Sequence, residues 1–154
     1  MLLSELITPE AVVHSLKGAT KKHVLMELSD RAGLISGLQP REIFDALIQR
    51  ERLGSTGIGE GIAIPHGKLA SAKAIFGLFA RLAKPIDFGA LDGIPVDLIC
   101  LLIAPEGAGA DHLKALARLA RVLRDPRITA KLRCARDVSG LYAVLTGEPA
   151  SHAA

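Results

Sequence analysis

The sequence predicts an α/β fold in three layers, with helices on both faces of a central sheet. Residues 96–103 are nearly all apolar, and a strand without polar alternation is expected to be covered on both faces. Segments with helical periodicity lie on either side of it in the sequence, at 20–52 and 111–145. The 154 residues suffice for one domain with a sizeable core, although 147–154 resemble a frayed tail.

The first third of the chain is expected to form helices around one strand. The start of the chain suggests a short helix followed by a strand near Val12. Thr20 is suited to cap a helix that Gly33 ends, and Pro40 occupies a favoured first position of the next helix. The inward face of that next helix is expected to consist of Ile43, Phe44, Leu47 and Ile48.

Three strands are expected in the middle of the chain, at residues 62–64, 74–82 and 96–103. Asp92–Gly93 is a turn signal between the last two of these strands. A short connection of this kind joins antiparallel strands, so these two strands are expected to pair as antiparallel neighbours.

The final third of the chain is expected to be helical. Asp111 can cap a helix that runs to about Arg124, and Asp125–Pro126 can end that helix and start another. A last helix is expected at 137–145, closed by Gly147. The apolar stripe of the helix that Asp111 caps is expected to be Leu113, Leu116, Ala117, Ala120 and Leu123.

The composition disfavours several classes of function. Charged residues make up 23% and aromatic residues only 3%, which is globular but too poor in rings for a platform that stacks bases. The formal charge of +3 is mild, and the Lys and Arg residues are dispersed apart from a cluster in the last third, so nucleic-acid binding is not expected. The start lacks a secretory signal, and the longest apolar run, 98–104, is far shorter than a membrane span of about 20 residues. Cytoplasmic residence, without membrane insertion, is therefore expected.

The candidate site is centred on the run from Gly54 to Lys68, where a glycine-rich segment leads through a short apolar strand to Pro65 and His66. Glycines let a backbone approach a ligand closely and expose its N–H groups. An imidazole in such a place can act as a nucleophile near neutral pH. The combination indicates a phosphoryl group handled by His66, and the alternative is a turn histidine without chemistry.

Two familiar phosphate-binding motifs do not fit this run. The dinucleotide motif G-x-G-x-x-G fails because Ile62 stands in the third glycine position. The nucleotide P-loop fails because five residues separate Gly61 from Gly67, and Leu69 replaces the required Ser or Thr. The run is therefore suited to a lone phosphoryl group rather than to a nucleotide with magnesium.

His112 is the second candidate, because it lies at the expected start of a helix. The positive end of the helix dipole disfavours an imidazolium there, and a neutral imidazole can donate one hydrogen bond to a phosphoryl oxygen. The alternative is an exposed histidine in a first turn.

No metal is expected, because His66 and His112 lack further ligands at suitable spacing. On the same helix, the stripe of Lys114, Arg118 and Arg121 is either a docking surface for a partner or a solvated face.

These residues resemble the active-site signature of the enzyme IIA proteins of the phosphoenolpyruvate-dependent phosphotransferase system. The run 54–68 is similar to the signature of the mannitol/fructose class and, within it, to that of the nitrogen-regulatory enzyme IIA. Further similarities are Arg50–Glu51 before the run, Pro95–Leu98 in a strand and Asp111–Leu113 at the start of a helix. The resemblance covers roughly 3–145 and implies an α/β/α sandwich around a mixed sheet.

The resemblance also implies a role for each residue of the site. His66 would be the phosphoryl-accepting histidine, and His112 would be the second active-site histidine, which supports the phosphoryl group. The positions that would bind or support the phosphoryl group beside them are Arg50, Thr56, Gly57, Gly59 and Gly67. Glu60 departs from the pattern, because the nitrogen-class motif often has asparagine there. A carboxylate near a phosphohistidine would repel it, unless it points outward or pairs with a cation.

The implied function is a phosphoryl relay between histidines, with a small histidine phosphocarrier protein as the donor and no cofactor. The donor must reach His66, so this ring is expected to be exposed in a shallow, mostly apolar depression, with loop N–H groups, Thr56 and His112 donating to the phosphoryl oxygens. The leading hypothesis is a regulator that acts through its phosphorylation state, since no transporter segment or second phosphotransferase domain is attached. The alternatives are a sugar-specific enzyme IIA that serves a separate permease and a non-catalytic binding module. The downstream target and the oligomeric state stay open.

Overall fold

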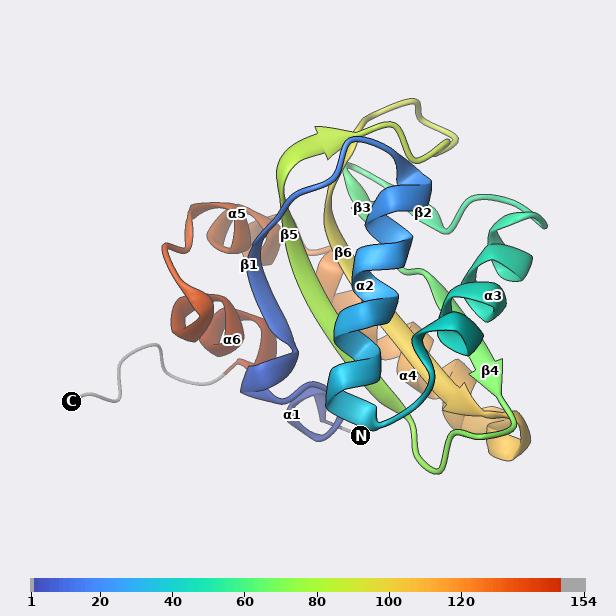
Figure 1. Cartoon of the computed structure of the whole chain (residues 1–154). Helices are drawn as coiled ribbons and strands as arrows, with labels where there is room; N and C mark the ends of the chain where they lie inside the picture. The colour runs from blue at the N-terminus through green and yellow to red at the C-terminus, as the bar shows by residue number, and fades with distance from the viewer. Residues whose placement is uncertain (1, 148–154) are drawn as a thin grey trace.

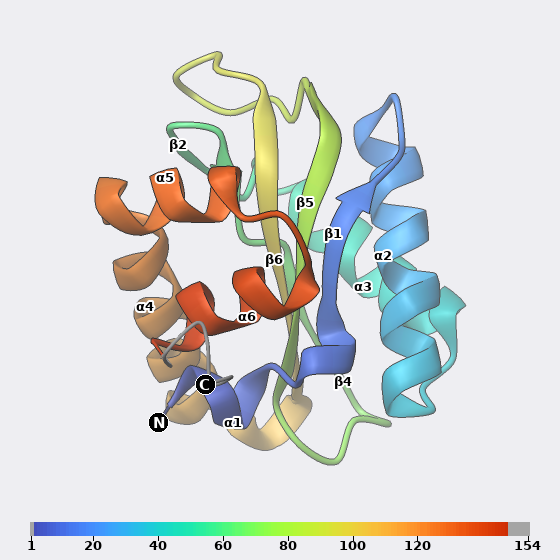
Figure 2. The same cartoon turned by 90° about the vertical axis from the view of Figure 1, so that its left-hand side faces the viewer.

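The computed structural model describes residues 2–147, and these residues form three layers (Figures 1 and 2). Helices α2 and α3 cover one face of a sheet, and α4, α5 and α6 cover the other face. The helices are α1 (Leu3–Leu6), α2 (Lys21–Ser36), α3 (Pro40–Glu51), α4 (Ala110–Leu123), α5 (Pro126–Cys134) and α6 (Val138–Thr146), with 3-10 turns at Pro9–Ala11 and Glu106–Ala108. The three-layer α/β/α fold expected from the sequence is confirmed.

The sheet is mixed and contains six strands. The strands are β1 (Val12–Leu16), β2 (Gly57–Gly59), β3 (Ile62–Ala63), β4 (His66–Leu69), β5 (Phe76–Ile86) and β6 (Val96–Pro105). Their order is β1-β5-β6-β3-β2, and β4 also pairs with β6. β5 and β6 are antiparallel, as the turn signal predicts, whereas β1 is parallel to β5 and both β3 and β4 are parallel to β6. β6 is buried along nearly its whole length, which explains its continuous apolar sequence.

Two strands, β2 and β4, are not among those that the sequence predicts. β2 contains two glycines in three residues, and β4 follows directly after Pro65. Such segments have little intrinsic preference for an extended conformation, so their strand geometry depends on the partner strand that pairs with them. β2 pairs with β3, and β4 pairs with β6. β5 also differs from the expected 74–82, because it begins at Phe76 and continues to Ile86.

The helix that Thr20 caps is longer than expected, because Gly33 does not end it. The helix α2 continues to Ser36, and Gly37 closes it with a left-handed φ of 79° and an N–H that donates to the Gly33 carbonyl. Gly33 is instead a close-packing residue. A Cβ at this position would lie 2.8 Å from Cγ of Pro40 and 3.0 Å from the carbonyl oxygen of Leu38, so glycine is required for α3 to approach α2.

The buried face of α4 is rotated relative to the expected stripe. Leu113 is 67% exposed and Ala117 is exposed, so neither belongs to the core. The buried residues of α4 are His112, Ala115, Leu119 and Leu123. Asp111 also does not cap the helix, because Gly109 precedes its first turn and no side-chain cap bond is present. The expected stripe is confirmed at Leu123, which is buried, and at Leu116 and Ala120, which pack against the core. It is wrong at Leu113 and Ala117, because the buried side of α4 is formed by His112, Ala115 and Leu119 instead.

The other helix caps agree with the sequence. Thr20 accepts a hydrogen bond from the N–H of His23, and Asp125 and Asp137 cap α5 and α6 in the same way. Gly147 closes α6. The rest of the expected tail, 148–154, lies outside the described residues. Within 2–147, no helix has the length and apolar character needed to cross a membrane.

Candidate functional site

His66 lies at the start of β4, where two short strands meet along β6. β3 pairs with Leu98 and Ile99 of β6. Further along β6, His66 of β4 pairs with Leu102. Between these strands, the Pro65 carbonyl accepts a hydrogen bond from the Leu102 N–H at 2.9 Å. His66 is therefore held by the central sheet, and it is not the turn residue that the alternative reading assumed.

The tautomer of His66 follows from one hydrogen bond. Nδ1 lies 2.8 Å from the carbonyl oxygen of Ile64, and a carbonyl can only accept, so Nδ1 carries the proton. The lone pair of the neutral ring is then on Nε2. This arrangement leaves Nε2 as the ring nitrogen with a free lone pair.

His112 lies close to His66 although the two residues come from different layers. The ring centroids are 5.6 Å apart, and the ring planes are inclined by 54°. His112 is only 6% exposed, and within residues 2–147 its Nε2 has no hydrogen-bond partner. A buried polar atom without a partner is rare in folded proteins and indicates a place where a further acceptor or donor binds. The structure thus brings together the two histidines that the sequence singled out.

Both imidazoles favour the neutral form. Burial lowers the pKa of His66, and the positive charge of Arg50 acts in the same direction, against the opposing effects of the Ile64 carbonyl and Glu51. Burial also lowers the pKa of His112, helped by the charges of His66 and Lys68. Each ring is therefore uncharged over a wider pH range than a free histidine.

A pocket of about 220 Å³ adjoins the His66 ring. Its walls come from the end of α3, the loop that follows it, the strands around His66 and the half-buried side of α4. The lining residues are Arg50, Ser55, Thr56, Gly57, Ile58, Ile64, His66, Leu116 and Ala120. His66 is half-buried in this pocket, so the exposed ring expected from the sequence is corrected: the glycine segment and α4 enclose part of it.

Arg50 supplies positive charge to this pocket. Its Nη1 donates a hydrogen bond to the Gly54 carbonyl at 3.0 Å, which fixes the side chain across the first residue of the glycine-rich run. A guanidinium has five N–H donors, so further donors remain for an anion. The position expected for Arg50 beside the site is therefore consistent with a bound phosphoryl group.

Glu51 is a site residue that the sequence reasoning did not identify. It is only 9% exposed, it accepts from the Thr56 N–H at 3.1 Å and from the Thr56 hydroxyl, and it pairs with Lys21 at 2.8 Å. Lys21 also donates to the Phe88 carbonyl at 3.2 Å. A sequence signal was available: an acidic residue in the last turn of a helix is disfavoured by the helix dipole and needs a compensating partner.

The roles expected for Thr56 and Gly57 are revised by these contacts. The Thr56 hydroxyl donates to Glu51, so in this arrangement its proton is not free for a phosphoryl oxygen. The Gly57 N–H donates to the Ser55 hydroxyl at 3.1 Å, and this hydroxyl donates to the Phe88 carbonyl at 2.9 Å. Both residues line the pocket, but their hydrogen bonds shape the loop.

Gly59 and Gly67 do not line the His66 pocket. Gly59 faces Asp92, whose Oδ2 would lie 3.2 Å from an added Cβ. Gly67 packs against α3, since a Cβ there would lie 3.1 Å from Cβ of Ala46. The lack of a side chain at Gly67 therefore lets α3 and β4 approach each other, rather than leaving room beside the imidazole.

Glu60 lies at the turn between β2 and β3 and is not part of the His66 pocket. Its side chain is exposed, its N–H donates to Asp92 and its carbonyl accepts from Arg133 at 2.8 Å. The repulsion between the Glu60 carboxylate and a phosphohistidine, which the sequence analysis considered, is therefore not expected, because this carboxylate does not line the His66 pocket. Glu60 has a φ of 59°, a left-handed conformation in which asparagine is enriched.

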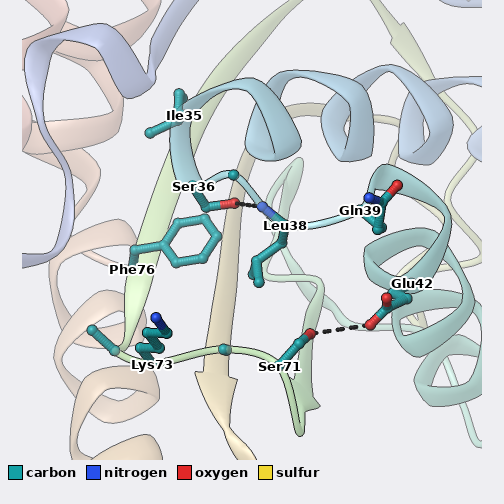
Figure 3. A pocket seen from close by; sticks show the side chains of 11 residues that line it. Ile35, Ser36, Leu38, Gln39, Glu42, Ser71, Lys73 and Phe76 are labelled. Carbon is teal, nitrogen blue, oxygen red and sulfur yellow. Dashed lines mark hydrogen bonds between the residues drawn. The ribbon is translucent and has the colours of Figure 1, made fainter.

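A larger hollow in the described part of the chain lacks this chemistry. A pocket of about 550 Å³ lies between the end of α2 and the segment after β4 (Figure 3). There, Ser71 points toward Glu42 and donates to it at 3.0 Å, while Phe76 and Leu38 supply apolar walls. No histidine lines this pocket, and residues 2–147 contain no group of three His, Cys, Asp or Glu side chains able to hold a metal ion.

Comparison with known proteins gives a consistent result. A family model described as "Phosphoenolpyruvate-dependent sugar phosphotransferase system, EIIA 2" matches residues 5–147. The chain is 55% identical to the nitrogen regulatory protein of Bradyrhizobium diazoefficiens over 153 residues, which cover 99% of this chain and 100% of that protein. It is 39% identical to the nitrogen regulatory protein of Escherichia coli K12 over 146 residues, which cover 94% of this chain and 89% of that protein. The crystal structure of nitrogen regulatory protein IIA-Ntr from Neisseria meningitidis is similar at a TM-score of 0.89, with 35% identity and with 94% of this chain and 99% of that chain covered.

Proposed function

Because this chain belongs to the type 2 enzyme IIA family of the phosphoenolpyruvate-dependent sugar phosphotransferase system, we propose that it carries a phosphoryl group on Nε2 of His66. The observation that carries this proposal is the hydrogen bond from Nδ1 of His66 to the Ile64 carbonyl, which leaves the lone pair on Nε2. The neighbouring His112, whose Nε2 has no partner among the described residues, supports the same assignment.

The transfer exchanges one nitrogen–phosphorus bond for another. The lone pair on Nε2 of neutral His66 attacks phosphorus and forms the new bond, while the bond to the donor histidine breaks and its electron pair returns to the donor imidazole. Because the two bonds are of the same kind, the protein needs mainly to position the groups and to stabilise charge. The lowered pKa of His66 favours the neutral ring that attacks.

We assign Arg50 and His112 to the phosphoryl oxygens. Arg50 lines the pocket and keeps N–H donors beyond the one that bonds Gly54. His112 can donate from Nε2 in the tautomer that carries its proton there, and a buried donor of this kind is worth more than one in water. Thr56 and Gly57 act indirectly, by holding the loop that forms the pocket.

A labelling experiment tests the acceptor. The protein is mixed with phosphoenolpyruvate and the upstream phosphocarriers, and its mass and radiolabel are followed. The unmodified chain is expected to gain one phosphoryl group that is labile in acid and stable in base. His66→Ala is expected to gain none, whereas the matched control His14→Ala, at an exposed position on β1, is expected to label normally. Label on the His66→Ala variant would contradict the assignment, and an unmodified chain that never labels would favour the binding-module alternative.

We also propose that the chain is a regulatory relay protein of the cytoplasm, which receives its phosphoryl group from a small histidine phosphocarrier and binds partners according to its phosphorylation state. The similarity to nitrogen regulatory proteins supports this role. The sugar-specific alternative rests on the description of the family as a sugar phosphotransferase system. Onward transfer distinguishes the two: rapid transfer from phosphorylated His66 to a purified sugar permease component would favour the alternative.

A further inference from the structure

Helices α4 and α5 concentrate positive charge that the phosphoryl site does not use. From Ala110 to Arg136 the sequence has eight Lys and Arg residues and two acidic residues, Asp111 and Asp125, although the whole chain has a formal charge of only +3. The two helices contact each other and lie on the same side of the sheet, opposite α2 and α3 (Figure 2). The charge is therefore gathered on one side of the molecule.

Some of these cations are already neutralised, and others are not. Arg127 pairs with Asp125 at 3.2 Å, and Arg133 pairs with Asp97 at 2.8 Å. The other six cations of this segment are exposed and form no ion pair with any residue in 2–147, and we call four of them the basic face. The basic face consists of Arg118, Arg121, Arg124 and Lys131. Such a set of unpaired cations attracts an anionic partner.

A pocket with apolar and charged walls opens beside the basic face. It has a volume of about 500 Å³ and lies between the end of α4, α5 and the β2–β3 turn. Ile58, Ile62, Leu123 and Pro126 supply apolar walls. Three charged residues line the pocket as well: Glu60, Arg133, which is paired with Asp97, and the unpaired Arg124 of the basic face. A hollow with apolar walls and a guanidinium beside it suits an apolar anchor side chain on an acidic segment, the usual pairing of pocket and anchor at protein interfaces.

We propose that the basic face and this pocket bind an acidic protein segment that inserts a branched aliphatic side chain. A protein segment fits better than a nucleic acid, because no aromatic residue lines the pocket to stack a base. The segment would lie beside the phosphoryl site: Leu116 and Ala120 line the His66 pocket, and Arg124 follows them at helical spacing on the same side of α4. Binding at this surface does not require the chemistry of His66.

The charge requirement can be measured with a defined probe. The probe is a short fluorescent peptide of glutamates with two central leucines, and binding is followed by anisotropy at low and physiological salt. The variant Arg118→Gln/Arg121→Gln/Arg124→Gln is expected to bind roughly tenfold more weakly, from the sum of several exposed charge pairs.

A matched control removes the same charge elsewhere. Lys22→Gln/Lys73→Gln/Lys84→Gln changes three exposed lysines outside the basic face and is expected to bind the peptide as the unmodified chain does. Equal weakening in both triple variants would overturn the proposal, because it would show a response to net charge alone. His66→Ala is expected to bind normally, which separates this surface from the phosphoryl acceptor.

The apolar requirement has its own test. Ala130 lines the pocket from an exposed position, so Ala130→Phe is expected to fill it and weaken binding several-fold without disturbing the core. A peptide with serines in place of the leucines is expected to bind weakly to the unmodified chain and to be insensitive to Ala130→Phe. Equal binding of the two peptides, or tighter binding of single-stranded DNA or phosphatidylglycerol vesicles than of the leucine peptide, would overturn the assigned partner.

Discussion

At the scale of single residues, the site depends on which nitrogen of each imidazole is available. His112 offers an unpartnered Nε2 in a buried place, so its removal is expected to remove a hydrogen bond to the phosphoryl group without removing the nucleophile. Transfer from phosphorylated His66 in the His112→Ala variant is expected to be slower by about 10²-fold. Rapid-quench measurement of single-turnover transfer provides the rate. An unchanged rate would remove the supporting role assigned to His112.

Arg50 and Glu51 act on His66 in opposite directions. The charge of Arg50 lowers the pKa of His66, and the charge of Glu51 raises it. Arg50→Gln is therefore expected to raise the pKa of His66, so that the ring protonates at higher pH and accepts phosphoryl groups less well near pH 6. Titration of the His66 ring by NMR provides the pKa. The exposed control Arg31→Gln, on the far part of α2, is expected to leave it unchanged.

Glu51 is also expected to matter for stability. Its carboxylate pairs with Lys21 and accepts two hydrogen bonds from Thr56, and all three contacts depend on its charge or its two oxygens. Glu51→Gln would leave the Lys21 ammonium without its partner and is expected to lower the free energy of unfolding by about 1–3 kcal/mol. Urea unfolding measures the change. A loss no larger than that of an exposed substitution such as Glu10→Gln would contradict the inferred network.

At the scale of the elements, Gly33 and Glu60 show two different constraints on the backbone: close packing between helices and a left-handed φ in a turn. Gly33 lets α3 pack against α2, and a Cβ there would lie 2.8 Å from Pro40. Gly33→Ala is expected to cost about 1 kcal/mol, since overpacking of about 1–3 kcal/mol exceeds the roughly 1 kcal/mol gain in helix propensity. Gly107→Ala is the matched control, because nothing lies within 4 Å of a Cβ at that position. Thermal unfolding of both variants compares them.

In the turn between β2 and β3, the strain lies in the backbone conformation of a residue that has a side chain. Glu60 adopts a φ of 59°, which is costly for a side chain that lacks the short polar group of asparagine. Glu60→Gly is expected to stabilise the protein by roughly 0.5–1 kcal/mol, whereas Glu60→Ala removes the same charge and keeps the strained φ. Equal stabilities of the two variants would show that the left-handed conformation carries no cost here.

At the scale of the whole molecule, the two histidines link stability to pH. The pKa values of His66 and His112 are lower in the folded protein than the usual 6.5, so at pH values between the folded and unfolded pKa the unfolded chain binds more protons. The contribution of the two histidines to the free energy of unfolding is therefore expected to be fully present above pH 6.5 and to be lost as the pH falls below this value. Urea unfolding across this range measures the slope. The His66→Gln/His112→Gln variant is expected to show a smaller slope, and an identical slope would assign the effect to other groups.

Much of the architecture was predictable because it depends on interactions between residues close in the sequence. The apolar run 96–103 specified a buried strand, and Thr20, Asp125 and Asp137 marked the starts of three helices through hydrogen bonds that span only a few residues. The setting of His66, after a glycine-rich run and a proline, was sufficient to select it as the candidate nucleophile.

The contacts that define the site were decided only by the tertiary structure. The approach of His112 to His66, the pairing of Glu51 with Lys21 and the packing of Gly67 against α3 each join segments from different elements. A sequence specifies the periodicity and the caps of each element through local bonds, but the distances between elements follow from how their faces pack together. For that reason the sequence alone determined which fold and which imidazole to consider, whereas packing between the elements decided which groups surround that imidazole.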